Sequence, residues 1–303
     1  MTGRAAIRRF LLAAFAAGVL AGCGGVMRIA YNNSDFALRM VANEYFDLEG
    51  EQQEQLKVQL ARFHEWHRRE ELPLYAEISQ GAGERLGRGL TREDVTWAFG
   101  AVRARYRVFM LQAADESAPV MATFRSSNYA ALEKKFADSN AKFAKEYLGP
   151  DQAKRNRART KWLIERFEFF MGDLTEAQVA LVERFVQSQP RINEVRLTDR
   201  KRRQQEFVEL LRQYQSSPEL AERLRGYFVN WEGRRGLEHA QYAREWEERL
   251  VQLVLDVDAT LTPEQRQRVV ARFEALAEDC RVLARQGRPS GDTRAAASAA
   301  EIR

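Results

Sequence analysis

The chain has 303 residues, with 48 Lys and Arg against 43 Asp and Glu, a formal net charge of +5 and a pI near 9.3. The basic balance is a weak argument for nucleic-acid binding: Arg4, Arg8 and Arg9 lie in an N-terminal segment that we expect to be removed, which leaves 45 basic against 43 acidic residues, or +2. The only cysteines are Cys23 and Cys280, so if Cys23 carries a lipid, no intramolecular disulfide can form.

The first 22 residues have the features of a bacterial lipoprotein signal peptide. Arginines without any acid precede an apolar stretch, Phe10 to Leu20, which is too short to cross a bilayer as a permanent helix. It ends in Leu20-Ala21-Gly22-Cys23, which resembles the lipobox, where small residues enter the peptidase and the cysteine thiol takes the diacylglycerol. We therefore predict cleavage between Gly22 and Cys23, with Cys23 as the site of lipid attachment. The alternative is an ordinary secretory signal with a chance cysteine.

The residue after Cys23 is Gly24, where an aspartate would indicate retention at the inner membrane. The resemblance to lipoproteins therefore implies an outer-membrane location, with the protein facing the periplasm. Two or three acyl chains anchor more firmly than one, because each buried methylene contributes about 0.8 kcal/mol. Residues 23–30 form a short tether, so we expect the domain to lie close to the lipid surface.

The rest of the chain has helical periodicity and lacks alternating β-branched runs, which predicts an all-α domain over residues 31–286. We expect about nine or ten helices in one bundle or in two packed bundles. Residues 287–303 have almost nothing to bury and are predicted to be a disordered tail. In chain order, the first predicted helix has a cap at Asn32–Ser34 and runs through Tyr45, the second spans 50–71, and the third runs from Pro73 to about Gly87. The fourth runs from Val95 to a point before Pro119. The others are predicted over 124–147, 151–172, 176–189 and 192–215, from Pro218 onward, and over 263–285.

Several predicted helices begin with one short motif. Leu-Thr-Glu-Ala-Gln at 174–178 and Leu-Thr-Pro-Glu-Gln at 261–265 share a form, and looser versions begin at Leu48, Leu90 and Leu148. The motif fits a capping box, in which the threonine accepts a hydrogen bond from an early backbone N–H and the Gln reaches back. A cap of this kind contributes about 1 kcal/mol. The motif therefore predicts helix starts, without requiring any function.

The segment from Phe63 to Tyr75, FHEWHRREELPLY, carries the densest chemistry. His64 and His67 are three residues apart, so they would be neighbours on a helix and could bind a metal ion together with Glu71. The spacing is not the His-Glu-x-x-His of zinc hydrolases. The alternative is an amphipathic helix end in which His67 packs and the charged residues around it form ion pairs.

Two basic runs could bind an anionic partner. The first contains Lys154, Arg155, Arg157 and Arg159, and the second spans residues 200–203. The partner would be lipid headgroups, lipopolysaccharide phosphates or an acidic protein surface. The first run adjoins a predicted helix start, where positive charge is unfavourable against the helix dipole. The alternative for both runs is a solvated helix face.

We find no catalytic constellation in the sequence: there is no Gly-x-Ser-x-Gly, no cysteine paired with histidine and no glycine-rich phosphate loop. We therefore expect a protein that is not an enzyme and needs no cofactor. Cys280 lies in a helical segment and is expected to be buried.

Three segments together resemble an uncharacterised family of Gram-negative lipoproteins, known as a domain of unknown function. They are Arg-Ile-Ala-Tyr-Asn-Asn at 28–33, His-Trp-His-Arg-Arg-Glu-Glu-Leu-Pro at the end of the second helix, and the stretch 167–178 that ends in Leu-Thr-Glu-Ala-Gln. The resemblance covers residues 23 to about 285 and implies a lipoprotein, with no established activity. The Leu-Thr-x-x-Gln motif is also similar to that of small periplasmic chaperones and metal-responsive sensors that form helical cradles.

The sequence therefore suggests three hypotheses. The first is a non-enzymatic envelope protein, anchored to the membrane by its lipid, that binds another protein or envelope component through a helical groove, as a chaperone does. The second is a metal- or stress-responsive sensor that uses His64 and His67. The third, an enzyme, would require a pocket where acidic side chains converge.

Overall fold

The computed structural model describes residues 24–189, 193–230 and 233–286, which are helical almost throughout and contain no strand. The prediction of an all-α fold is therefore confirmed. The elements are α2 (Gly24–Asn32), α3 (Ser34–Phe46), α4 (Glu51–Trp66), the π-helical turn η1 (His67–Glu71), α5 (Leu72–Arg88), α6 (Arg92–Met121), α7 (Ser126–Tyr147), α8 (Gln152–Met171), α9 (Glu176–Gln187), α10 (Asn193–Tyr214), α11 (Leu220–Val229), α12 (Leu237–Ala259) and α13 (Pro263–Gln286).

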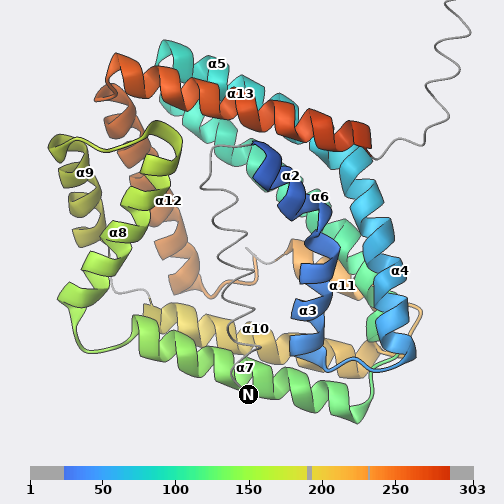
Figure 1. The fold of residues 1–303 in the computed structure, drawn as a ribbon. Helices are drawn as coiled ribbons and strands as arrows, with labels where there is room; N and C mark the ends of the chain where they lie inside the picture. Colours follow the sequence, from blue (N-terminus) through green and yellow to red (C-terminus); the bar gives the residue numbers. More distant parts are fainter. Residues whose placement is uncertain (1–23, 190–192, 231–232, 287–303) are drawn as a thin grey trace, which may run out of the picture.

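The helices are arranged as the four sides of a frame (Figure 1). Helices α5 and α13 pack side by side along one side, and α7 and α10 pack together along the opposite side. Helices α8, α9 and α12 form the third side, and α4, packed on α6, forms the fourth. Helix α2 lies along α13, and α3 runs from the end of α2 toward α7.

The hydrophobic core is divided among the sides of this frame. The largest cluster joins α6, α7, α10 and α11 and buries Leu132, Leu211 and Leu224 completely. A second cluster joins α8, α9, α12 and α13 around Val182, and a third joins α5 to α13 around Leu283. Each fully buried aliphatic side chain contributes about 1.5–3 kcal/mol, and these contributions are spread over three clusters that join neighbouring sides of the frame.

Two of the Leu-Thr-x-x-Gln caps meet face to face where α9 and α13 begin. Thr175 and Gln178 form a capping box, and Thr262 and Gln265 bond reciprocally in the same way. The two buried amides also bond each other, with Gln178 Nε2 donating to Gln265 Oε1 at 2.8 Å and Gln265 Nε2 donating to Gln178 Oε1 at 3.0 Å. Each amide therefore caps its own helix and joins it to the other.

The same arrangement recurs where α4 and α7 begin. Gln52 Nε2 donates to Asn128 Oδ1 at 3.1 Å, and Asn128 Nδ2 donates to Gln52 Oε1 at 3.3 Å. Each amide oxygen also accepts a backbone N–H just before its own helix: Gln52 from Glu49, which precedes the cap residue Gly50, and Asn128 from the cap residue Arg125. The two pairs of caps hold two corners of the frame, one between α9 and α13 and one between α4 and α7 (Figure 1).

Two predicted helix limits were wrong. Helix α6 was expected to end before Pro119 but continues to Met121. A proline so close to the helix end removes one backbone bond, and burial of Val120 and Met121 in the largest cluster offsets that loss. The stretch after Pro218 was expected to hold one helix before the last, but it holds two, α11 and α12.

The N-terminal part is more continuously helical than we expected. Residues 24–30, assigned to the tether, lie in α2, and the Asn33 side chain donates to Ile29 O instead of capping α3. Helices α4 and α5 are joined through η1, where Leu72 N–H bonds His67 O in the wider π-helical pattern. Pro73 has no N–H to donate, which explains the irregular turn before it. None of the helices in the described ranges is long and apolar enough to cross a membrane.

Candidate functional site

The residues predicted for cleavage and lipid attachment, Gly22 and Cys23, lie outside the described residues, as does the predicted tail at 287–303. Their roles therefore stay predictions. The structure begins at Gly24, the first residue of α2, and shows how the chain that follows Cys23 meets the helical frame.

Helix α2 is held against η1 and α13 by polar contacts from its middle to its C-terminal end. Arg28 forms an ion pair with the buried Asp279, with Nε 2.8 Å from Oδ1. Tyr31 Oη is hydrogen-bonded to His67 Nδ1 at 2.9 Å, and Asn32 Oδ1 accepts from Arg68 Nη2 at 2.7 Å. We call these contacts the α2 docking site. They join residues 28–33 to the end of the second predicted helix, two of the three segments on which the family resemblance rested.

Arg68 and His67 form the centre of the α2 docking site. The Arg68 guanidinium lies 5.1 Å from the centroid of the Tyr31 ring and donates to Leu283 O in α13 at 3.1 Å. The His67 ring makes edge contacts with Tyr75 and with Phe109. Burial, together with the neighbouring positive charges, lowers the pKa of His67 to about 4, and burial raises the pKa of Tyr75 to about 12. His67 is therefore a neutral hydrogen-bonding group at pH 7.

The structure does not bring His64, His67 and Glu71 into one ligand set. His64 packs its ring on Tyr31, with 4.7 Å between centroids, and its buried Nε2 has no hydrogen-bond partner among the described residues. Glu71 points to Arg105, whose Nη1 lies 3.2 Å from Glu71 Oε1. No group of three or more His, Cys, Asp or Glu side chains in the described ranges is placed to hold a metal ion. The geometry matches the alternative, a helix end packed by its histidines.

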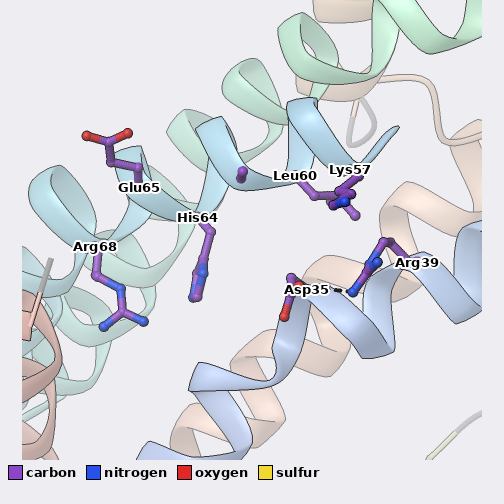
Figure 2. A pocket seen from close by; sticks show the side chains of 8 residues that line it. Asp35, Arg39, Lys57, Leu60, His64, Glu65 and Arg68 are labelled. Carbon is purple, nitrogen blue, oxygen red and sulfur yellow. Dashed lines mark hydrogen bonds and ion pairs between the residues drawn. The ribbon is translucent and has the colours of Figure 1, made fainter. Parts of the chain in front are cut away.

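A shallow groove of about 360 Å³ lies between α3 and α4, beside the α2 docking site (Figure 2). Figure 2 shows His64 of α4 and Arg68 of η1 extending toward α3, and Arg39 turned toward Asp35, 3.3 Å away. The charges on its walls are mixed, so the groove does not select one sign of ligand. Its polar lining residues are Asp35, Arg39, Lys57, His64, Glu65 and Arg68.

The first basic run is divided between two faces of α8. Lys154 and Arg157 are exposed, as a solvated face predicts, whereas Arg155 and Arg159 are half-buried. Arg157 lines a groove of about 690 Å³ between α8 and α9, whose walls also carry three glutamates. The pKa of Arg159 is lowered by burial and by the positive charge of Arg196 in α10. The four residues therefore do not form one patch.

The second basic run has a structural role around Asp199, a buried residue that we did not single out in the sequence. Asp199 accepts hydrogen bonds from Arg202 Nη2 at 2.7 Å, from Arg203 Nε at 2.9 Å and from Gly236 N–H at 3.2 Å, and its Oδ2 lies 2.9 Å from His239 Nδ1. Burial raises the pKa of this carboxyl, but the hydrogen bonds outweigh burial and lower it to about 2. The network fastens the start of α12 to α10. The sequence did contain a signal for these ion pairs, because Asp199 stands three and four residues before Arg202 and Arg203, a spacing that places them on one face of a helix.

Cys280 is buried in the cluster between α5 and α13, which confirms that prediction. Burial raises the pKa of its thiol to about 11, so the thiolate needed for nucleophilic attack is scarce at neutral pH.

The pattern of a protein family, described as a family of unknown function (DUF6279), matches residues 44–233. The chain belongs to this family. The match runs from the end of α3 through α11, so it includes η1, the arginines of α8 and Asp199 with Arg202 and Arg203, but not α2. The resemblance to an uncharacterised family is thereby confirmed. No curated protein and no solved structure matches the chain.

Proposed function

We propose that this chain is a lipid-anchored protein of the bacterial cell envelope that binds another envelope component and catalyses no reaction. The observation that carries the proposal is the α2 docking site. Helix α2 begins at Gly24, one residue after the cysteine of the lipobox, and is bonded to the frame at its middle, through Arg28, and at its C-terminal end, through Asn32.

The α2 docking site would hold the helical frame rigidly relative to the lipid anchor. An acyl group on Cys23 would be followed at once by a helix that Arg28 and Asn32 hold to α13 and η1. The frame would then meet the membrane in one orientation instead of turning freely on a stalk. Gly24 in place of aspartate favours the outer membrane, with the frame in the periplasm. A fixed orientation lowers the entropy that a binding protein loses when it captures a partner.

Exposed apolar side chains near the proposed anchor support binding. Ile29, Phe36, Val41 and Val58 expose about half or more of their surface, with fractions of 64, 51, 50 and 48 %. They lie on α2, α3 and α4, the elements around the docking site. Exposed apolar side chains of this kind are available for contact with a protein or a lipid.

The anchor is tested by labelling cells with a clickable palmitate analogue. The wild-type chain is expected to take the label and to fractionate with the outer membrane. Cys23→Ser is expected to take no label and to retain residues 1–22. The matched control is Cys280→Ser, which keeps the lipobox and should be labelled like the wild type. An unlabelled wild-type chain, or one in the cytoplasm, would contradict the proposal.

Binding is tested separately by crosslinking in living cells, with a photoreactive residue in place of Phe36 or Val58. A discrete crosslinked species from these positions, and none from exposed Lys154 on the far side of the frame, is the expected result. The purified protein is also expected to suppress aggregation of an unfolded outer-membrane protein. Failure of both assays would remove the binding role and leave the anchor unaffected.

A further inference from the structure

The groove between α3 and α4 contains two buried polar atoms that lack a partner (Figure 2). They are Arg39 Nε, from α3, and His64 Nε2, from α4, and neither has a hydrogen bond within the described part of the chain. A buried polar atom without a hydrogen bond is unfavourable, because it has lost the bonds that it made to water. Such atoms on two walls of one groove indicate that a bound molecule completes their hydrogen bonds.

Both atoms can donate a hydrogen bond to a ligand. The Nε atom of an arginine carries a hydrogen and never accepts one. Burial, with the positive charge of Arg68 as a second cause, lowers the pKa of His64, so its imidazole is neutral at pH 7 and carries a proton on one of its two nitrogens. With that proton on Nε2, His64 and Arg39 both donate into the groove. They therefore favour a ligand with oxygen acceptors.

Lys57 supplies a third donor on the α4 wall. Its ammonium lies 3.6 Å from Glu54 Oε2, and because the two side chains are 62 and 77 % exposed, solvent weakens this pair and leaves the ammonium available to a ligand. Arg68, another cation of the groove, is already bonded to Asn32 and Leu283. Three donors match the several acceptor oxygens of a phosphate group better than the two of a carboxylate.

The groove also contains a carboxylate, which would repel a simple oxyanion. Asp35 Oδ2 lies 3.3 Å from Arg39 Nη2, longer than the about 2.7–2.9 Å of a strong charged hydrogen bond, and the Asp35 side chain is 42 % exposed. Asp35 also opposes the lowering of the His64 pKa, so its charge acts on the imidazole. A ligand with a positive group beside its oxyanion would satisfy both signs of charge. The mixed lining therefore favours a zwitterion.

The groove has room for a small molecule. Its volume of about 360 Å³ lies within the about 300–1,000 Å³ that is typical of small-molecule sites. Because the groove is shallow and open to solvent, the group that it binds can also belong to a larger molecule.

We propose that this groove binds a small zwitterion of the phosphoethanolamine class, in which a short ethylene link joins a phosphate to a primary ammonium. The phosphate accepts hydrogen bonds from Arg39, His64 and Lys57, and the ammonium donates to Asp35. The zwitterion is either a free molecule or the headgroup of a phospholipid. The site goes beyond the proposed function, because it requires neither a lipid on Cys23 nor a protein partner.

Helix α4 offers a matched control. Arg62 is exposed on this helix and is not among the residues that line the groove. Arg62→Gln therefore removes the same charge as Arg39→Gln and leaves the groove intact. A loss of binding that is specific to Arg39 separates a defined site from attraction by net charge.

The experiment is calorimetry on the full chain in an uncharged detergent, with phosphoethanolamine as the first probe. Arg39→Gln is expected to weaken binding by about tenfold or more, whereas Arg62→Gln stays within about twofold of the wild type. Phosphocholine has no N–H on its ammonium, so the wild type is expected to bind it about tenfold more weakly than phosphoethanolamine. Asp35→Asn should weaken the binding of phosphoethanolamine and leave the affinity for inorganic phosphate unchanged or higher.

Glycerophosphoethanolamine distinguishes the two sources of the zwitterion. It carries the phosphodiester of a phospholipid headgroup, without the acyl chains that would enter the detergent. Binding as tight as that of phosphoethanolamine assigns the ligand to a lipid headgroup, and binding of phosphoethanolamine alone assigns it to a free molecule. Neither probe depends on an acyl group at Cys23, so this test and the labelling test of the anchor can fail separately.

A thermal measurement separates a binding role from a structural one. His64→Phe keeps an aromatic ring against Tyr31 and removes the unpartnered Nε2, so without ligand its melting temperature is expected to equal or exceed that of the wild type. Phosphoethanolamine is expected to raise the melting temperature of the wild type and of Arg62→Gln, but not of His64→Phe.

Four results would each overturn the proposal. Neither phosphoethanolamine nor glycerophosphoethanolamine binds, or phosphocholine or inorganic phosphate binds as tightly as phosphoethanolamine. Arg62→Gln loses as much affinity as Arg39→Gln, or His64→Phe keeps the affinity of the wild type.

Discussion

Acidification tests the α2 docking site directly, because the site depends on a neutral His67. The folded protein lowers the pKa of His67 from 6.5 to about 4, so the unfolded chain takes up a proton before the folded protein does. The stability contributed by this residue is therefore fully present above pH 6.5 and is lost as the pH falls toward 4. Between about pH 7 and pH 4.5 the loss amounts to about 2 kcal/mol of the free energy of unfolding.

The assay is chemical denaturation at a series of pH values, with His67→Gln as the comparison. His64 and His239 also have lowered pKa values, so the difference between wild type and variant isolates the contribution of His67. The wild type is expected to lose about 2 kcal/mol more than His67→Gln between these limits. Amide exchange in residues 24–32 should rise over the same range as α2 loosens.

Two parallel pH curves for wild type and His67→Gln would refute this reasoning. Tyr31→Phe provides a second variant, since it removes the hydroxyl that bonds His67 Nδ1 but leaves the imidazole buried. It is expected to lower stability by about 1 kcal/mol at neutral pH and to keep most of the pH dependence. That outcome would assign the pH dependence to burial of the imidazole instead of its hydrogen bond.

Three further outcomes are expected. Gln265→Leu leaves the buried Gln178 amide without one of its partners and should lower the free energy of unfolding by about 2 kcal/mol in denaturant titrations. The double variant Gln178→Leu/Gln265→Leu should lose less free energy of unfolding than the sum of the two single variants. Asp199→Asn removes the charge that pairs with two arginines and should lower the free energy of unfolding by about 2–3 kcal/mol at pH 7. This difference from the wild type should shrink as the pH falls from about 4 toward 2, and a difference that stays constant would contradict the lowered pKa of Asp199. Arg28→Ala should speed amide exchange in 24–32 without changing the helical circular dichroism, and unaltered exchange would show that α2 is held by other contacts.

Helices and their starts could be predicted from the sequence because the interactions that define them lie within five residues. Thr175 and Gln178 satisfy each other's backbone groups across one turn, and so do Thr262 and Gln265. That Gln178 and Gln265 also bond each other could not be predicted, because 87 positions separate them. The second pair was less visible still, since Asn128 starts a helix without the Leu-Thr form.

The candidate sites show the same contrast between local features, which could be predicted, and long-range contacts, which could not. The spacing of Arg155 and Arg159 puts them on one face of a helix, but nothing local says that this face is half-buried while Lys154 and Arg157 are exposed. His64, His67 and Glu71 lie close in sequence, yet the neighbours of each come from other helices: Tyr31 from α2 for the histidines, and Arg105 from α6 for Glu71. Long-range partners decide whether a polar side chain serves as ligand, anchor or packing.

Local rules thus gave this chain its helices, its caps and the expectation of a lipobox, since hydrogen bonds within a turn and the order of a few neighbouring residues are enough to specify them. The packing of helices far apart in the chain decided which faces became buried, how three core clusters share one frame and which charged side chains found a counter-charge. Burial and charge depend on every group brought within a few ångströms, and no short stretch of sequence contains that information.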